Sequence, residues 1–447
     1  MLTSIGQVII QVLKNKEKDK FDLLVKQLFP IDIALALEYS TEEELKTFIK
    51  FTTPEYHAKV LEQAKEKLQL RLLRHFDYSE AVHLFTKMSK DDVVDTIGNL
   101  PTNLRKELLH QMKVSEFVTI DELLSYSPKS AGGIMTTEFI AVNELMNTKE
   151  ALDIVIAEGY ESEVIETIFV LNQKNELMGT ADLRDILASD RSVLMRDITN
   201  ENHLSVFPET DQEKVALLVS KYDLKAVAVV NQNNNLLGII TVDDIIDVIV
   251  EEQTEDILRF GGVSGEETTG GTLIHSIQRR IPWLIINLGT AFLAAFTVTL
   301  FESVIAQVVA LASSMSIVTG MGGNAGNQTL SVVIRSIALG ELELKKSWHR
   351  VFREIAIGIV QGAIVGLFAG IILYFKVGNP MIGFIIFLAM IGNMIVASTS
   401  GFLIPLILKH FNFDPALGSS IFLTASTDVL GFFFFLGLAT LFLPWLV

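Results

Sequence analysis

The chain contains no cysteine among its 447 residues, which excludes disulfide bonds and metal sites built from thiolates. It also lacks a P-loop, an HExxH motif and a recognisable Ser/His/Asp arrangement. ATP hydrolysis and proteolysis are therefore unsupported, and we expect that the protein is not an enzyme. The first residues, MLTSIGQVIIQVLKNKEKDK, lack the basic start and the small-residue cleavage site of a signal peptide, so none is expected there.

Charged residues are scarce from Ile281 onward, where seven Lys and Arg against six Asp and Glu give a net charge of +1. The whole chain carries −17, so residues 1–280 carry −18 and form an acidic half. A surface of that sign repels nucleic acid and anionic lipid and concentrates cations, so no nucleic-acid partner is expected. Acidic surfaces also aid solubility, and charge alone does not assign a cation-binding role.

The nearly uncharged half contains five apolar segments long enough to cross a bilayer, which takes about 20 residues as a helix. Basic residues precede the first segment at Arg279 and Arg280, lie between the second and third at 345–353, and follow the fourth at Lys409. If the spans alternate, these residues share one side, and the positive-inside rule predicts a cytoplasmic N-terminal half and an external C-terminus. The predicted spans are 281–302, 304–334, 355–376, 382–408 and 415–443.

The last apolar segment contains one acidic residue, Asp428, on the same helical stripe as Ser420 and Thr424. A charge at the centre of a bilayer costs at least ~3 kcal/mol on insertion scales, so such residues are rare and usually functional. Two structural alternatives stay open at this point. Asp428 could form an ion pair with Arg335, or it could be protonated and bond to another helix.

A second polar stripe lies in TGMGGNAGNQ (319–328), where Gly320, Gly323 and Asn327 recur at helical spacing. Glycines allow close helix approach and amides bond across helices, so packing alone could explain the motif. The adjacent amides Asn327 and Gln328 exceed that need, and unwound backbone at membrane depth occurs only where it lines a cavity or is buried in protein. Carbonyl, amide and carboxylate oxygens together suit a hard cation such as Mg²⁺ or Ca²⁺.

Five motifs, which together cover nearly the whole apolar half, occur in an order and at a spacing that resemble the MgtE family of magnesium channels. They are RRIPWL (279–284), GMGGNAGNQ (320–328), RSIALGEL (335–342), DPAL (414–417) and STDVLGF (426–432).

The resemblance implies a homodimer in the lipid bilayer, with five spans per subunit and a pore on the dimer axis that conducts Mg²⁺ inward. A carboxylate would hold the hydrated ion through its water shell, because Mg²⁺ dehydrates reluctantly. Ser316 stands where the family usually has proline, which bears on the helix break expected near the motif. Carried over by position, the residues around the ion would be Asp428, Thr424, Asn327, Gly320 and Gly323.

An internal repeat lies in the acidic half, where FVLNQKNELMGTADLRDIL (169–187) aligns with AVVNQNNNLLGIITVDDII (228–246) at a constant offset of 59. Each copy predicts a strand, a polar turn, a strand and a helix. Units of this size resemble tandem α/β CBS domains, at 129–190 and 191–250. Such pairs often bind an adenine nucleotide, for which Arg184, Asp185 and Thr241 are the candidates, and a pair that binds no nucleotide stays equally open.

The segment DDIIDVIVEEQTEDILRF (243–260) is rich in acids and has helical periodicity, and it leads through a glycine-containing linker to residue 276. In the family, the equivalent connecting (plug) helix ties the CBS pair to the pore, and Mg²⁺ bound among acids holds the channel shut. A solvated acidic helix face is the alternative. The candidate sensor ligands are Asp244, Asp247, Glu252 and Glu255, together with Asp92 and Asp95 from the N-terminal region.

Residues 1–128 lack strand-like alternation and predict related helix pairs that stack as a short superhelix. We therefore expect a multi-domain protein of the cell (inner) membrane, with this helical domain, the CBS pair, the connecting helix at 243–276 and a five-helix transmembrane domain at 277–447. Its expected function is Mg²⁺ uptake through a selective channel that intracellular Mg²⁺ closes. A Na⁺- or H⁺-coupled secondary transporter of divalent cations, in which Asp428 binds the coupling ion, is the alternative.

Overall fold

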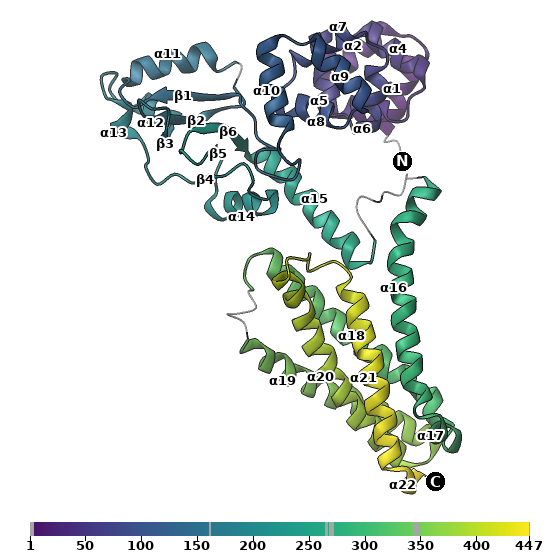
Figure 1. The fold of residues 1–447 in the computed structure, drawn as a ribbon. Coiled ribbons are helices and arrows are strands. Elements are labelled where there is room, and N and C mark those ends of the chain that lie inside the picture. Colours follow the sequence, from purple (N-terminus) through teal and green to yellow (C-terminus); the bar gives the residue numbers. More distant parts are fainter. Residues whose placement is uncertain (1–3, 161, 264–266, 268–271, 343–347, 447) are drawn as a thin grey trace. The chain divides into compact units, whose positions relative to one another are not determined.

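The computed structural model describes residues 4–160, 162–263, 267, 272–342 and 348–446 (Figure 1). The chain divides into two compact units, Met1–Ile249 and Val250–Val447, each with its own hydrophobic core. The boundary between them falls inside one helix, α15 (Val242–Phe260).

The described residues 4–124 form ten helices of 8 to 11 residues. Helices of this length are marginal in isolation, so caps and packing must stabilise them. A capping box opens α4, where the Glu44 carboxylate accepts from the Thr41 amide at 2.7 Å, and a second one opens α7. The ten are α1 (Ser4–Lys14), α2 (Lys18–Gln27), α3 (Pro30–Leu37), α4 (Glu42–Phe51), α5 (Pro54–Glu62), α6 (Glu66–Leu73), α7 (Tyr78–Phe85), α8 (Lys90–Gly98), α9 (Thr102–Gln111) and α10 (Val114–Leu124).

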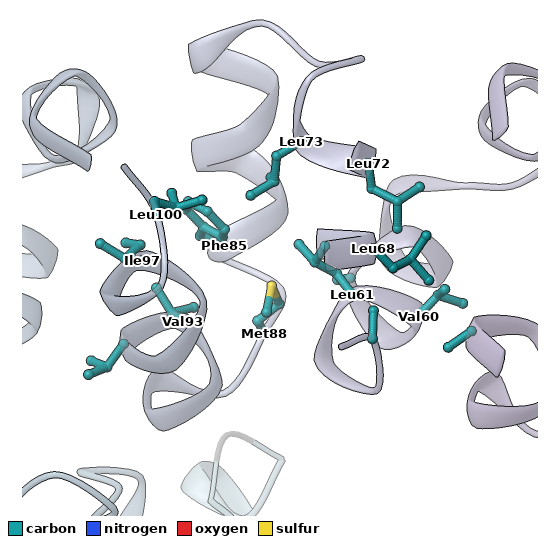
Figure 2. Close-up of a cluster of buried hydrophobic side chains, with 14 of the residues drawn as sticks. Val60, Leu61, Leu68, Leu72, Leu73, Phe85, Met88, Val93, Ile97 and Leu100 are labelled. Atoms are coloured by element: carbon teal, nitrogen blue, oxygen red, sulfur yellow. The ribbon is translucent and has the colours of Figure 1, made fainter. Parts of the chain in front are cut away.

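A shared core joins these short helices. Figure 2 shows Leu61 of α5, Leu68 of α6, Phe85 of α7 and Ile97 of α8, all of them buried, in one cluster. Each helix alone would expose this apolar face, and stacking on its neighbours removes it from water. The all-helical prediction for this part of the chain is confirmed.

Two three-stranded sheets of the same topology follow, and in each the first strand is parallel and the third antiparallel to the second. The first consists of β1 (Phe139–Asn143), β2 (Val164–Leu171) and β3 (Leu177–Asp182), and the second of β4 (Ser205–Val206), β5 (Ala226–Val230) and β6 (Leu236–Thr241). The accompanying helices are α11 (Thr148–Glu158), α12 (Leu183–Ala188), α13 (Met195–Ile198) and α14 (Gln212–Tyr222), and α15 follows β6.

The internal repeat seen in the sequence is a repeat of turn geometry. Asn172 and Asn231 each accept, at 3.0 Å, the backbone N–H four residues later. Asn175 and Asn234 each take a left-handed backbone, with φ of 62° and 61°, which asparagine tolerates better than most residues. The predicted order of strand, turn, strand and helix is confirmed in both copies.

The second unit contains five helices of 23 to 31 residues among its described residues: α16 (Leu273–Thr299), α18 (Ala310–Ala338), α19 (Arg350–Val377), α20 (Pro380–His410) and α21 (Ser419–Leu441). Two short helices, α17 (Glu302–Gln307) and α22 (Leu443–Leu446), complete it. Four of the long helices, α16, α19, α20 and α21, are long and apolar enough to cross a membrane. The glycines, amides and hydroxyls of α18 lower its hydropathy, so a fifth span stays a prediction.

The helix bounds differ from the predicted spans in two places. Helix α16 begins at Leu273 rather than near Ile281, and the second predicted span is divided between α17 and α18. Within α18, residues 310–338 are helical without interruption, and no break occurs at Ser316. Serine keeps the backbone N–H that proline lacks, so the hydrogen-bond ladder of the helix continues through this position.

Helices α19 and α20 pack through a glycine stripe that the sequence analysis did not recognise. Gly358, Gly362, Gly366 and Gly370 recur every four residues and are buried against α20. A Cβ atom at Gly362 would lie 2.6 Å from the Cα atom of Ile391, so only glycine allows this approach. Small residues at this spacing are typical of tightly packed membrane helices.

Candidate functional site

The glycines of α18 divide into two faces. A Cβ atom at Gly322 would lie 2.2 Å from the Asn393 side chain, and one at Gly326 would lie 2.6 Å from the Leu423 side chain. At Gly320 and Gly323, by contrast, an added Cβ would meet no atom within 4 Å. Packing within the chain therefore explains two of these glycines, whereas the other two line an open face.

Oxygen atoms gather on α18 and α21 beside this face. The two helices pack against each other, and Asn327 and Thr424 directly follow the contacting pair Gly326 and Leu423. Asn327 Oδ1 is buried and has no hydrogen-bond partner among the described residues. Asp428 is half-buried one helical turn beyond Thr424. A carboxylate on one helix and an unpartnered amide oxygen on the helix packed against it are hard ligands of the kind that a cation prefers.

The sequence left two structural alternatives for Asp428, an ion pair with Arg335 and a protonated carboxyl group, and the structure bears on the first. No ion pair joins its carboxylate to Arg335 in the part of the chain that the structure describes. The Arg335 side chain is exposed on α18. Pairing with this arginine therefore has no geometric support, and a protonated carboxyl that bonds between helices stays open.

A hollow of about 210 Å³ lies between the middle of α16 and the N-terminal end of α21. Ser420 and Thr424 line it from α21, and Asn287 and Trp283 line it from α16. The backbone of Gly261 and Gly262, just after α15, forms the remaining wall. Thr424 therefore belongs both to the predicted ion path and to this hollow.

Within the second unit, two contacts hold the C-terminal end of α15 against the start of α21 and the loop before it. Arg259 forms ion pairs with Glu255 and with Asp414 of the DPAL motif. The Ser420 hydroxyl donates to the Phe260 carbonyl at 2.9 Å. The predicted sensor residue Glu255 thus pairs with an arginine. It lies eleven residues beyond Asp244, which on a helix is about 16 Å along the axis.

A cluster of carboxylates forms within the first unit where α8, β2 and the start of α15 come together. Burial and the neighbouring charge of Asp91 raise the pKa of Asp92 to about 8 and that of Asp244 to about 7. Partial burial and the charges of Asp91 and Glu138 likewise raise the pKa of Glu163 to about 7. Each raised pKa means that ionising the carboxyl group is unfavourable at this place, because the group is partly buried and lies near other acids. A bound cation would offset the repulsion among these negative charges.

Hydroxyl groups and one lysine hold these carboxylates. The Ser89 hydroxyl donates to Asp92 at 2.7 Å, the Thr241 hydroxyl lies 2.7 Å from Asp244, and Lys90 Nζ lies 3.6 Å from Glu138. Among the described residues, no three acidic or histidine side chains are close enough to hold one metal ion directly. The cluster therefore has negative charge and oxygen atoms of the kind that cations prefer, but no ready set of direct ligands among the described residues.

The predicted sensor residues fall into different places. Asp92 and Asp244 lie in the cluster, and the charge of the exposed Asp95 acts on Asp92. Asp247 is exposed one turn further along α15, and Glu252 lies beside Asp256 in the second unit. The sequence analysis missed Asp91, Glu138, Glu163 and Asp243. Of these four, only Asp91 and Asp243 could have been suggested by the sequence, because they are adjacent to the predicted ligands Asp92 and Asp244.

The nucleotide candidates are also separated. An open groove of about 480 Å³ runs beside α12 and is lined by Arg184, Asp182, Glu166 and Lys225. Asp185 is exposed but is not among its lining residues. Thr241 is buried, and its hydroxyl lies within hydrogen-bond distance of Asp243 and Asp244 instead. Of the three predicted residues, Arg184 alone lines the groove.

Comparisons with known proteins agree along the whole chain. The family model described as a divalent cation transporter, MgtE, matches residues 315–438, the MgtE intracellular N domain matches 28–129, and the CBS domain matches 131–191 and 195–251. The magnesium transporter MgtE of Bacillus subtilis is 31% identical over 438 residues, which cover 98% of this chain and 97% of the relative. That of Enterococcus faecalis is 35% identical over 73% of this chain and 72% of its own length.

Two solved structures are each similar to a little more than half of this chain. One is the soluble part of a magnesium transporter, with a TM-score of 0.52, 30% identity, and coverage of 56% of this chain and 99% of that one. The other is the cytosolic domain of the Mg²⁺ channel MgtE in complex with ATP, with a TM-score of 0.51, 26% identity, and coverage of 54% and 99%.

Proposed function

The chain belongs to the MgtE family of divalent cation transporters, and we propose that it is a Mg²⁺-selective channel for magnesium uptake across the cell membrane. The observation that carries this proposal is the open face of α18. A Cβ added at Gly320 or Gly323 would meet no atom of the described residues within 4 Å, and both glycines share with Asn327 the helix that packs against the helix of Asp428. Glycine at these two positions leaves room for a hydrated ion, or for a second subunit that surrounds the same ion.

The proposed ion path works by charge and by water-mediated contact. The Asp428 carboxylate attracts a divalent ion twice as strongly as a monovalent ion at the same distance. Mg²⁺ holds its octahedral water shell tightly, so the oxygens of Asn327 and Thr424 act as partners for those waters rather than as direct ligands. In a homodimer, two copies of Asp428 would face the same ion. The membrane topology stays as predicted from the basic residues, with the first unit cytoplasmic and the C-terminus external.

The proposed regulation uses the acidic cluster. Intracellular Mg²⁺ neutralises the carboxylates around Asp92 and Asp244, and at low Mg²⁺ their repulsion separates the elements that bear them. Helix α15 begins in this cluster, and its last turn, which belongs to the second unit, bears the contacts of Arg259 with Asp414 and of Phe260 with Ser420. It is therefore the element through which binding biases the path toward its closed state.

We also propose that an adenine nucleotide binds the CBS pair in the groove beside α12. The ATP complex of the similar cytosolic domain supports this assignment. Lys225 and Arg184 supply positive charge for phosphate groups, and Asp182 supplies an acceptor for a ribose hydroxyl. Loss of nucleotide binding in a Lys225→Ala variant, measured by calorimetry on the full chain, is the expected result, and unchanged affinity would remove the groove from consideration.

The ion path is tested by replacing its carboxylate. Asp428→Ala should abolish Mg²⁺ uptake into proteoliposomes while the protein is still inserted, because the only acid of α21 is lost. Glu302→Ala is the matched control, because Glu302 is an exposed acid of α17. It should leave the flux unchanged. Normal flux in Asp428→Ala would refute the proposed path.

The transport mode needs a separate measurement, because a coupled transporter would also depend on Asp428. Single-channel recording in bilayers separates the two modes. Discrete conductance steps without any Na⁺ or H⁺ gradient are expected for a channel. Slow, saturable flux that requires such a gradient would establish the secondary transporter instead.

The sensor is tested by limited proteolysis of the full chain in detergent, with and without millimolar Mg²⁺. Protection of the acidic half by Mg²⁺ is the expected result, and an Asp92→Asn, Asp244→Asn double variant should lose it. If the unmodified chain gains no protection, the regulatory part of the proposal fails while the ion path stands on its own test.

A further inference from the structure

Asn393 is an amide in the middle of α20, a helix that is otherwise apolar over most of its length. Its side chain is fully buried. Its Nδ2 donates to the Val318 carbonyl of α18 at 2.8 Å, across 75 residues of sequence. This bond joins two long helices of the second unit, and its acceptor is a carbonyl in the interior of α18.

Two glycines on two other helices make room for this amide. A Cβ atom at Gly322 of α18 would lie 2.2 Å from Asn393 Nδ2, and one at Gly431 of α21 would lie 2.8 Å from the same atom. Neither glycine has a positive φ, so backbone conformation does not explain why glycine occupies these positions. The two glycines are therefore explained by the amide that fits between them, and Asn393 touches both α18 and α21.

Stability alone does not account for an asparagine here. Its Oδ1 is buried and has no hydrogen-bond partner among the described residues. A buried polar atom without a partner costs about 1–3 kcal/mol, which cancels most or all of the gain from one amide bond. An apolar side chain of similar size would pack at no such cost. What the amide adds is a directional contact that sets the spacing of three helices.

The contacts of Asn393 with α18 and α21 lie close in sequence to the residues of the proposed ion path. Gly431 follows Asp428 by three residues, so both lie within one turn of α21. On α18, Gly322 is adjacent to Gly323 of the open face. The asparagine thus contacts α21 within one turn of Asp428 and contacts α18 next to Gly323.

We propose that Asn393 is a positioning residue that fixes the separation of α18 and α21 behind the ion path and thereby sets discrimination between Mg²⁺ and larger divalent cations. The inference rests on the proposed function of Asp428. Mg²⁺ demands a nearly regular octahedral shell, whereas Ca²⁺ accepts variable distances and coordination numbers. Loosening the two helices therefore penalises Mg²⁺ more than Ca²⁺.

The test compares initial Mg²⁺ and Ca²⁺ uptake by the purified full chain in proteoliposomes, per inserted protein. Asn393→Leu keeps the branched shape of the side chain and removes the amide. We expect the Mg²⁺ to Ca²⁺ rate ratio to fall by about tenfold, which is less than the ~100-fold that a 1 Å misplacement can cost in rate at an organised site. Gly431→Ala, which places a Cβ against the amide, should act in the same direction. Gly437→Ala is the matched control on α21, because an added Cβ there meets no atom within 4 Å.

A pair of changes separates positioning from simple damage. Asn393→Ala removes the amide that the new Cβ of Gly431→Ala would strike, so the two effects should be non-additive, and the double variant should have about the same rate ratio as Asn393→Ala alone. An unchanged ratio in Asn393→Leu, or equal losses for both ions that follow the folded fraction, would overturn the proposal. Persistent flux in Asp428→Ala would instead overturn the proposed function, and the two failures are thus distinguishable.

Discussion

Replacing Asp92 by asparagine removes one negative charge from the acidic cluster and preserves the shape of the side chain. Burial and the charge of Asp91 raise the pKa of Asp92 from 3.8 to about 8. Between these values the folded chain holds a proton that the unfolded chain has released. The stabilising contribution of this group is therefore present below pH ~3.8 and is lost as the pH rises through about 8.

The magnitude follows from the shift. At about 1.4 kcal/mol per unit, a change from 3.8 to about 8 corresponds to a loss on the order of 2–5 kcal/mol by pH 8, allowing for solvent screening of the half-buried group. Asp92→Asn should recover most of this free energy near pH 8 and almost none near pH 4. Mg²⁺ competes with the protons, so its stabilising effect on the unmodified chain should be larger at about pH 8 than at about pH 6, and smaller in the variant.

Hydrogen exchange of the full chain in detergent measures these effects locally. Amides of α8 and of residues 242–249 report the free energy of opening of the cluster, with and without millimolar Mg²⁺. Asp153→Asn is the control, because Asp153 is an exposed acid of α11 outside the cluster. Lower protection of α8 in Asp92→Asn near pH 8, or Mg²⁺ protection that is independent of pH, would refute the reasoning.

Three further predictions concern other parts of the chain. Arg259→Met removes the ion pair to Asp414 and should raise the open fraction at millimolar Mg²⁺ several-fold in single-channel records; an unchanged open fraction would show that this contact does not hold the closed state. Gly362→Ala should lower stability in detergent by about 1–3 kcal/mol, because the new Cβ strikes the α20 backbone, whereas Gly437→Ala should not. Burial lowers the pKa of His57, so stability should fall as the pH drops below about 6.5, and a His57→Leu variant should lose that dependence in pH-resolved melting.

Local patterns in the sequence were sufficient for features that depend on neighbouring residues. The offset repeat placed Asn172 and Asn231 in equivalent turns because an asparagine side chain bonds to backbone only a few residues away. The apolar residues of the acidic segment 243–260 recur with helical spacing, and this segment forms α15 as predicted. The apolar runs likewise identified the long helices of the second unit, although their ends shifted where a run continued into amphipathic residues.

Features that depend on distant residues could not be obtained in this way. Glu138 and Glu163 join Asp91 only because the fold brings a loop, a strand and α8 together. Gly322 and Gly323 are identical neighbours in sequence, yet one is filled by Asn393 and the other lines the open face. Nothing in a run of glycines distinguishes these roles, because the partner atoms come from helices about 70 to 100 residues later in the chain.

The acids of α15 are divided between two environments. Asp244 belongs to the carboxylate cluster of the first unit, where burial and the charge of Asp91 raise its pKa to about 7. Glu255 lies in the second unit, where it pairs with Arg259, and the same arginine also pairs with Asp414. The two acids are eleven residues apart on one helix, which is about 16 Å along its axis. One metal ion cannot contact carboxylates that far apart, because Mg²⁺ holds its ligands at about 2.1 Å. The acids of α15 therefore cannot all be ligands of a single metal ion.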